Sequence, residues 1–445
     1  MQNETVNKQS GLHVMSSTAV WMSWSALVVL LYALDLGFSF AQLFGLLALS
    51  GFAAAAFQLV FFFLGDRALQ PSFIRLTSGL LILPCVLMIG LFSQPNLDYT
   101  LLQLLAIACG LGGAQLFLRS MHGLDDTQTS GWDLAVTASV GGLGILVAQI
   151  LTPLLAIVPN FLGASVATFT TDISTGTVLG GLRPGAVLTL ANIGIFFAGL
   201  VLVAIIRRPL SQCESTPLST PTTTRRALLR NPHTWLMTVL YIMSFGTFVG
   251  LALSFPLVLK FIFGVSRHWQ EGQLLAVLSN DYAPQALTYA WLGPLIGVVV
   301  RPLGGWLADQ YGGAKVTLAC SVALTLVSLA AAWVTRSAYL SSAPEAYFLL
   351  FLLIFFALFA AASIASSAIC RSASVLFPAH QLPSALRWLS ACAIAGAGYM
   401  PLMWGVHSVT GTPDLAFIAF AGFYGLCGLL VVSVYLRRHS VYFNP

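Results

Sequence analysis

The feature that most constrains this chain is a series of twelve apolar runs, each long enough to cross a bilayer as a helix. Hydrophobic residues make up 58% of the 445 positions and charged residues only 7%, so polar side chains cannot cover a soluble globule of this size. We therefore predict an all-α membrane protein with twelve transmembrane helices. The runs lie near 12–34, 40–64, 74–93, 100–122, 134–158, 187–206, 233–263, 285–308, 315–335, 345–369, 385–407 and 414–436.

The composition changes once, at 207–232, where Pro, Ser, Thr and Arg replace the apolar pattern. We expect a solvated cytoplasmic linker here, between six-helix bundles at 1–206 and 233–445. Two bundles related by a pseudo-two-fold axis are typical of rocking-bundle transporters, which bind substrate between the bundles near the middle of the membrane. Three local matches between the halves support the repeat. Gln58 stands eight residues before Asp66, as Arg301 stands eight before Asp309. Leu118-Arg119-Ser120 matches Cys370-Arg371-Ser372, and the small-residue stretch 141–144 matches 393–398.

Basic residues are distributed unequally between the two sides of the predicted membrane. By the positive-inside rule, this bias predicts a multi-pass protein of the inner (cytoplasmic) membrane with both termini in the cytoplasm. The net charge of +5 follows from the same bias and does not indicate nucleic-acid binding. The terminal side holds Lys8, Arg67, Arg75, Arg207, Arg208, Arg225, Arg226, Arg230, Lys315, Arg387, Arg437 and Arg438, and the opposite side holds Arg183, Lys260, Arg267 and Arg336.

Arg301 stands in the middle of an apolar stretch, where a helix should be crossing the bilayer. A guanidinium there costs about 3 kcal/mol or more, so we expect it to face a cavity and bind an anion. The alternative is a structural pair with a helix terminus or a carbonyl. Gln58, its counterpart in the first half, is neutral, and it either donates amide hydrogens to the same ligand or packs between helices.

Metal, cofactor and enzyme chemistry are not indicated by the sequence. Its seven cysteines and seven histidines show no metal-ligand spacing, and the spans contain no nucleophile–base pair or paired carboxylates. We therefore predict no catalytic residues, no metal and no cofactor. No Asp or Glu stands in the middle of a span, which favours anion exchange or uniport over carboxylate-mediated proton coupling.

The segment Gly304-Gly305-Trp306-Leu307-Ala308-Asp309, followed by Gly312-Gly313, resembles the loop signature of the major facilitator superfamily. More specifically, the chain resembles the nitrate/nitrite porter branch at Trp235-Leu236-Met237, Phe248-Val249-Gly250 and Gly293-Pro294-Leu295-Ile296-Gly297. In that branch one arginine from each half holds a planar anion between aromatic side chains, beside Gly/Asn signature helices. This chain has Gln58 in place of the first arginine, and neither signature helix contains Asn.

The resemblance implies a substrate site built from Arg301, Tyr241, Phe245, Gln58 and Trp24. A planar guanidinium fits two oxygens of nitrate or nitrite at once, and aromatic rings exclude water from the site. The fifth span adds two glycines that either touch the substrate or only allow close helix packing, Gly142 and Gly144.

The signature also implies an inner gate, in which Asp309 caps a neighbouring helix beside Gly305 and Gly312. Its first-half copy, at Asp66, is eroded. Arg119 and Arg371 lie near the cytoplasmic ends of their spans. They are expected to snorkel to the interface, to attract anions, or to pair at the gate with an aspartate: Asp125, Asp126 or Asp133.

Together these features predict a monomeric transporter that moves a small anion of the nitrate/nitrite class by alternating access. Two alternatives remain open. One is a related facilitator for another small anion or a polar solute. The other is a sensor that binds an anion without transporting it, although the short linker and tail offer little room for an interaction domain.

Overall fold

The computed structural model describes residues 2–115, 130–159, 167–173, 175–177, 180–182, 184–207, 222–270, 273–437 and 442–445. In these residues ten helical segments are long and apolar enough to cross a membrane. Two shorter apolar helices, Tyr99–Ala114 and Ala191–Ile206, occupy the fourth and sixth predicted spans. The predicted all-α membrane architecture is therefore confirmed.

The helices fall into two groups along the chain. Those of the first half are α1 (Gln2–Ala33), α2 (Phe40–Leu64), α3 (Asp66–Leu69), α4 (Pro71–Leu80), α5 (Ile82–Phe92), α6 (Tyr99–Ala114), α8 (Gly131–Ile157) and α9 (Ala191–Ile206). Those that follow are α10 (Thr222–Arg230), α11 (Pro232–Tyr241), a π-helical turn (Ile242–Gly246), α12 (Thr247–Phe263), α13 (Ala286–Tyr289), α14 (Leu292–Tyr311), α15 (Gly313–Leu340), a 3₁₀ turn (Pro344–Tyr347), α16 (Phe348–Leu376), α17 (Leu382–Ala393), α18 (Gly396–Thr410) and α19 (Pro413–Tyr435).

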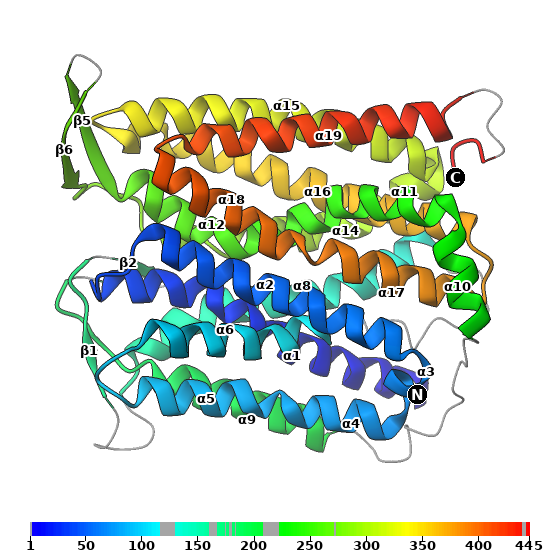
Figure 1. The fold of residues 1–445 in the computed structure, drawn as a ribbon, viewed down its shortest axis with the longest axis horizontal. Coiled ribbons are helices and arrows are strands. Elements are labelled where there is room, and N and C mark those ends of the chain that lie inside the picture. Colours follow the sequence, from blue (N-terminus) through cyan, green and yellow to red (C-terminus); the bar gives the residue numbers. More distant parts are fainter. Residues whose placement is uncertain are drawn as a thin grey trace.

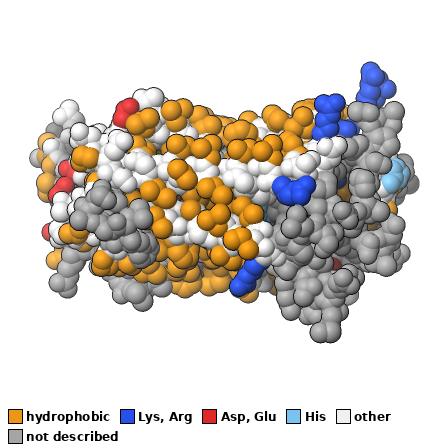
Figure 2. Space-filling model, turned by 90° about the horizontal axis from the view of Figure 1, so that it is seen from below, with side chains coloured by type: hydrophobic (Ala, Val, Ile, Leu, Met, Phe, Trp, Pro, Cys, Tyr) orange, Lys and Arg blue, Asp and Glu red, His pale blue; other side chains and the backbone are white. Residues whose placement is uncertain are grey.

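The two groups lie side by side as bundles (Figure 1). Both ends of the chain lie at one end of the molecule, as an even number of crossings requires, and the β5–β6 hairpin lies at the other. Figure 2 shows a broad apolar belt, with Lys and Arg gathered toward the end that holds the termini and Asp and Glu toward the opposite end. A belt of this kind suits a lipid environment, because lipid chains offer no hydrogen-bond partners.

Short antiparallel hairpins follow two of the spans, where the sequence predicted only loops. β1 (Phe169–Thr170) pairs with β4 (Val187–Leu188), and β2 (Thr175–Thr177) pairs with β3 (Gly180–Leu182). β5 (Val265–Gln270) pairs with β6 (Gln273–Ser279), which is apolar from Leu274 to Leu278. Because these strands are short and only β4 overlaps a predicted span, the hydropathy pattern did not indicate them.

Local residue chemistry sets several helix boundaries that matter for the site. Ser130 caps α8 by accepting a hydrogen bond from the Asp133 backbone N–H, and Asn231 caps α11 in the same way through His233. Gly312 ends α14 at a φ of 86°, a conformation that favours glycine. The end of the predicted linker also differs from expectation, since it forms the helix α10.

Candidate functional site between the bundles

Arg301 lies on α14 with only 4% of its surface exposed, and its guanidinium reaches across the bundle interface. One terminal nitrogen donates to the Ala138 carbonyl of α8, at 3.1 Å. Nε and the other terminal nitrogen donate to the Ser366 hydroxyl of α16, at 3.3 and 3.0 Å. In the part of the chain that the structure describes, no carboxylate pairs with Arg301. Its charge is therefore held by neutral dipoles that an anion can replace.

Aromatic faces cover the Arg301 guanidinium. Its central carbon lies 5.4 Å from the ring centre of Phe245 and 5.4 Å from that of Phe248. Tyr241 stacks on Phe245 with ring centres 5.3 Å apart, and the Cys370 thiol lies 3.7 Å from its hydroxyl. These rings exclude water, which strengthens any charge interaction made by Arg301.

The π-helical turn Ile242–Gly246 places these rings. Tyr241 ends α11 and Phe245 lies within the turn, so the wider spacing of the π-helix brings the two rings nearly parallel, at an interplanar angle of 14°. Turns of this kind interrupt α-helices mostly at functional sites. The predicted grouping of Arg301, Tyr241 and Phe245 is thus present in the structure.

Gln58 lies on α2 and is also buried, with 4% of its surface exposed. Its amide nitrogen donates to the Ser390 hydroxyl of α17, at 3.3 Å. Like Arg301, Gln58 therefore joins its own bundle to the other one. Gln58 thus packs between helices, with a serine hydroxyl and not a backbone carbonyl as the acceptor, and contact between Gln58 and a substrate stays a prediction.

Three other predicted substrate residues have packing roles in the structure. Trp24 is fully buried in the core, where its indole N–H faces the Cys109 thiol. A side chain at Gly142 would meet Val298 of α14 at 2.4 Å. One at Gly144 would meet the Met15 carbonyl of α1 at 2.4 Å. Both glycines thus allow close helix approach, and substrate contact by these residues is untested.

Asp309 closes the end of the bundle interface that lies toward the chain termini. Its two carboxylate oxygens accept from the backbone N–H groups of Gly131 and Trp132, at 3.0 and 3.3 Å, which begin α8 of the other bundle. A carboxylate at a helix start is stabilised by the free N–H groups and the helix dipole. The predicted capping of a neighbouring helix by Asp309 is therefore present.

Arg371 also differs from its predicted role. Its Nε lies 2.6 Å from an Asp309 oxygen, so it pairs with Asp309 and not with Asp133. Asp133 instead accepts from the hydroxyl of Ser130, the cap of its own helix. Two further proposed partners, Asp125 and Asp126, and the repeat residue Arg119 lie outside the described residues.

The signature glycines allow the backbones at this gate to touch. A side chain at Gly305 would lie 2.2 Å from the Gly131 carbonyl oxygen, so the turn of α14 and the start of α8 exclude any larger residue there. Gly312 is covered by Asn444, whose amide donates to the Tyr311 carbonyl at 2.8 Å. In the first half Asp66 begins the short helix α3, after Gly65.

Aromatic residues close the opposite end of the interface. The Phe261 ring of α12 lies 5.1 Å from Phe40 and 6.3 Å from Phe44, both on α2 of the other bundle. The Asp309 contacts thus join the two bundles at one end of the interface, and these rings join them at the other.

Sequence reasoning did not identify two neighbours of Arg301, namely Ser366 and Phe248. A signal for Ser366 was present, because Ser363, Ser366 and Ser367 interrupt an otherwise apolar run. Hydroxyls inside a span need partners, and a buried guanidinium is one that can use them. Phe248 was visible only as part of the family motif.

The two groups of helices, which pack side by side with the buried Arg301 between them, have the fold of the major facilitator transporters. Solved structures with this fold include a D-xylose–proton symporter, at 13% identity and a TM-score of 0.64 over 96% of both chains. Another is the human organic anion transporter MFSD10, at 14% identity and a TM-score of 0.59 over 97% of this chain and 100% of that one. No family model matches the chain.

Over nearly its whole length the chain is homologous to curated nitrate/nitrite transporters. It is 26% identical to the nitrate/nitrite transporter NarU of Escherichia coli over 448 residues, which cover 94% of this chain and 88% of that protein. It is 27% identical to the probable nitrate/nitrite antiporter NarK2 of Thermus thermophilus over 434 residues, which cover 95% and 88%. The resemblance to the nitrate/nitrite porters is therefore confirmed, and these relatives are transporters and not enzymes.

Proposed function

We propose that this protein transports nitrate, nitrite or both across the cytoplasmic membrane by alternating access, with Arg301 as the anion ligand. The observation that carries the proposal is a buried guanidinium without a carboxylate partner among the described residues, held between the Phe245 and Phe248 rings. A small planar anion would accept hydrogen bonds from two parallel N–H groups of Arg301 while the rings exclude water.

The contacts of Arg301 also suggest how binding is linked to movement of the bundles. One guanidinium nitrogen donates to the Ala138 carbonyl of the other bundle. An anion that takes this donor would replace a bond between the bundles with a bond to substrate. We infer that substrate binding and release change the contact between α14 and α8, which the Asp309 cap also joins.

We further propose that the protein works as a monomer with residues 1–206 and 233–445 as its moving bundles and both termini in the cytoplasm. The basic end of the apolar belt, at the end that holds the termini, supports this orientation (Figure 2). The lack of a mid-span carboxylate in the sequence favours exchange of anions, or uniport, over carboxylate-mediated proton coupling.

A second candidate is transport of a different small anion, which the neutral Gln58 favours. A single arginine opposite one monoanion leaves the occupied site roughly neutral, whereas two arginines would leave it positive. Lower positive charge weakens selection for anions over neutral polar solutes, and the missing second guanidinium weakens selection for a planar anion over other small anions.

Proteoliposomes test both candidates directly. The purified protein, reconstituted with nitrate inside, should take up labelled nitrite or nitrate against excess external chloride or formate. Inhibition by chloride or formate as strong as that by unlabelled nitrate would favour the second candidate. Absence of both nitrate and nitrite transport, from vesicles in which the protein is shown to be folded, would refute the proposal.

A further inference from the structure

The linker helix α10 is fastened to the first bundle by one of its faces. Arg225 donates to the Phe62 and Phe63 carbonyls at the end of α2, at 3.4 and 3.2 Å. Its guanidinium lies on Gly65, where a side chain would come within 2.0 Å of it. Leu228, one turn later on the same face, is fully buried. The helix is thus held in place and its opposite face is fixed in orientation.

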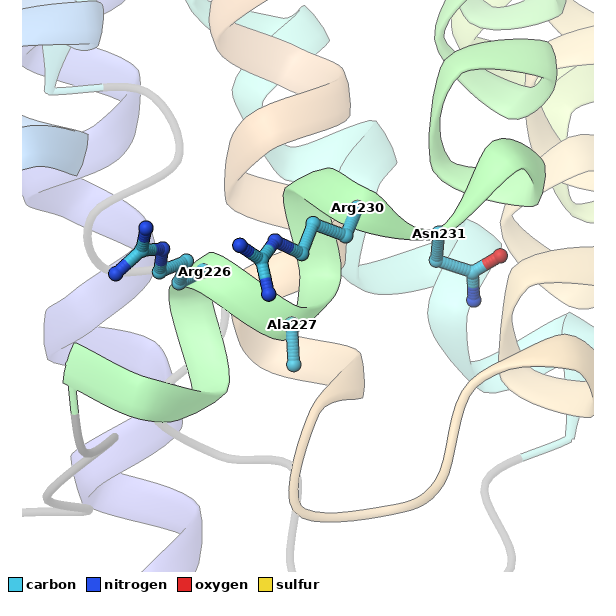
Figure 3. Close-up of a pocket in the computed structure, with 4 residues that line it drawn as sticks. All are labelled: Arg226, Ala227, Arg230 and Asn231. Carbon is cyan, nitrogen blue, oxygen red and sulfur yellow. The ribbon is translucent and has the colours of Figure 1, made fainter.

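That opposite face carries two arginines one helical turn apart. Arg226 and Arg230 are exposed and, with Ala227 and Asn231, line an open groove of about 450 Å³ (Figure 3). No carboxylate is among these lining residues. The Arg226 and Arg230 guanidinium groups lie next to each other, whereas the Asn231 side chain points away from them and caps α11 (Figure 3). Like charges four residues apart on a helix repel, and a bound anion would relieve that repulsion.

The groove lies at the level of the membrane where lipid headgroups are found. Trp235, in the first turns of α11, is 51% exposed, and its indole nitrogen donates to the Leu229 carbonyl of α10 at 2.9 Å. Tryptophans with one apolar and one polar side mark the boundary between lipid and water. The apolar span Pro232–Phe263 begins directly after the groove, at the basic end of the molecule shown in Figure 2.

We propose that Arg226 and Arg230 bind the phosphate of an anionic phospholipid headgroup. Guanidinium groups match phosphate oxygens in pairs, and negative lipids concentrate at basic segments next to a span. The bound lipid would hold α10 in place, and with it the Arg225 contact on the Gly65 turn. This inference concerns a site outside the bundle interface and does not depend on which solute is transported.

Native mass spectrometry of the detergent-purified protein tests the site with phosphatidylglycerol and phosphatidylcholine as probes. We expect the wild type to retain phosphatidylglycerol preferentially. The Arg226→Gln/Arg230→Gln variant should bind it about tenfold or more weakly, because each arginine near the headgroups contributes to the attraction. The matched control, Arg75→Gln/Arg437→Gln, removes the same charge from exposed positions at the same end and should bind phosphatidylglycerol as the wild type does.

The proposal is overturned if the wild type and the Gln variant bind phosphatidylglycerol equally, or if the wild type retains both lipids equally. It is also overturned if an equal concentration of inorganic phosphate displaces the lipid. The last result would assign the groove to a soluble phosphate. If the Gln variant fails to fold, Arg226→Lys/Arg230→Lys and a salt titration of the wild type replace it. Lysine should keep most of the lipid preference, and salt should weaken it; a salt-independent preference would count against the site.

Discussion

Gln58 and Arg301 occupy corresponding places in the two bundles and make corresponding contacts. Each stands eight residues before an aspartate at the end of the interface that lies toward the chain termini, and each is 4% exposed. Gln58 donates across the interface to Ser390 of α17, and Arg301 donates across it to the Ala138 carbonyl of α8. One position is neutral and the other is cationic.

The comparison separates what the scaffold requires from what the substrate requires. Both positions need a long polar side chain with N–H donors, because both join the bundles through a hydrogen bond. Only Arg301 carries a charge, and the Phe245 and Phe248 rings lie over that charge. Hydrogen bonding between the bundles therefore accounts for a polar side chain at both positions, and the proposed function would account for the charge of Arg301.

The largest effect is expected from neutralising Arg301, which makes it equal in charge to Gln58. Arg301→Gln should lower nitrate transport in proteoliposomes by a hundredfold or more, since about 3 kcal/mol of charge-assisted binding is lost. Arg301→Lys keeps the charge but not the planar pair of donors, and should also lose most transport. Initial uptake rates of nitrate measure both effects.

Ser366→Ala serves as the control for this pair of variants. It removes a hydroxyl that orients Arg301 but leaves the guanidinium in place, so transport should fall far less than in Arg301→Lys. Thermal unfolding and gel filtration should show that all three variants fold. Near-normal uptake by Arg301→Lys would refute Arg301 as the anion ligand.

The second expected effect comes from placing a positive charge at position 58. Gln58→Arg should tighten nitrate binding about ten- to a hundredfold, because one charge-assisted hydrogen bond contributes roughly 1.5–3 kcal/mol. Gln58→Met, which keeps the length but removes all donors, separates loss of the Ser390 bond from gain of charge. Calorimetry of nitrate binding to the three proteins gives the comparison.

A failure of Gln58→Arg to tighten nitrate binding would show that the first bundle has been rebuilt for another solute. In that case the same substitution should also block transport of the native substrate. If neither the wild type nor Gln58→Arg binds nitrate, the nitrate assignment itself is wrong.

The twelve spans and the inner gate were predictable from the sequence because each depends on local chemistry. Long apolar runs must form helices in lipid, and Asp309 within its glycine signature indicates a helix-capping carboxylate. The partners across the interface were not predictable. Ala138 contributes only a backbone carbonyl, and a residue's identity does not show which carbonyl a distant arginine will reach. The pairing of Arg371 with Asp309 was not among the predicted partners, because sequence separation does not reveal which helix ends meet.

The inner gate gives a third, smaller effect. Asp309→Asn keeps an acceptor for the Gly131 N–H but loses the charge that faces Arg371 and the start of α8. We expect the gate to open more often, so that the buried Cys370 next to Arg371 reacts about tenfold faster with a maleimide added from the gate side. Peptide mass spectrometry identifies the labelled cysteine.

Asp133→Asn provides the matched control for the gate, because it removes a carboxylate from the same start of α8 but leaves the Asp309 cap and the Asp309–Arg371 pair in place. Its Cys370 labelling should equal that of the wild type. Unchanged labelling in Asp309→Asn, together with lost nitrate binding, would instead give Asp309 a role in holding substrate.

The smallest expected effect distinguishes the glycine turn at Gly65 from the one at Gly312. In each half, a segment that follows the last span of the bundle covers the glycine turn: Arg225 lies on Gly65, and Asn444 lies on Gly312. Asn444 also accepts from the Lys315 backbone N–H at 3.1 Å, so it joins the end of α14 to the start of α15. Of the two turns, only the second directly follows the helix that carries Asp309 and Arg301.

Asn444→Ala should therefore raise Cys370 labelling about two- to fivefold, in the same direction as Asp309→Asn, since it removes two hydrogen bonds that contribute roughly 0.5 kcal/mol each at this exposed position. Arg225→Ala removes the corresponding cover from the first turn and should leave the labelling rate unchanged. An equal rise in the Cys370 labelling rate of both variants would mean that the two turns control the gate together. The functional difference between the bundles would then be confined to Gln58 and Arg301.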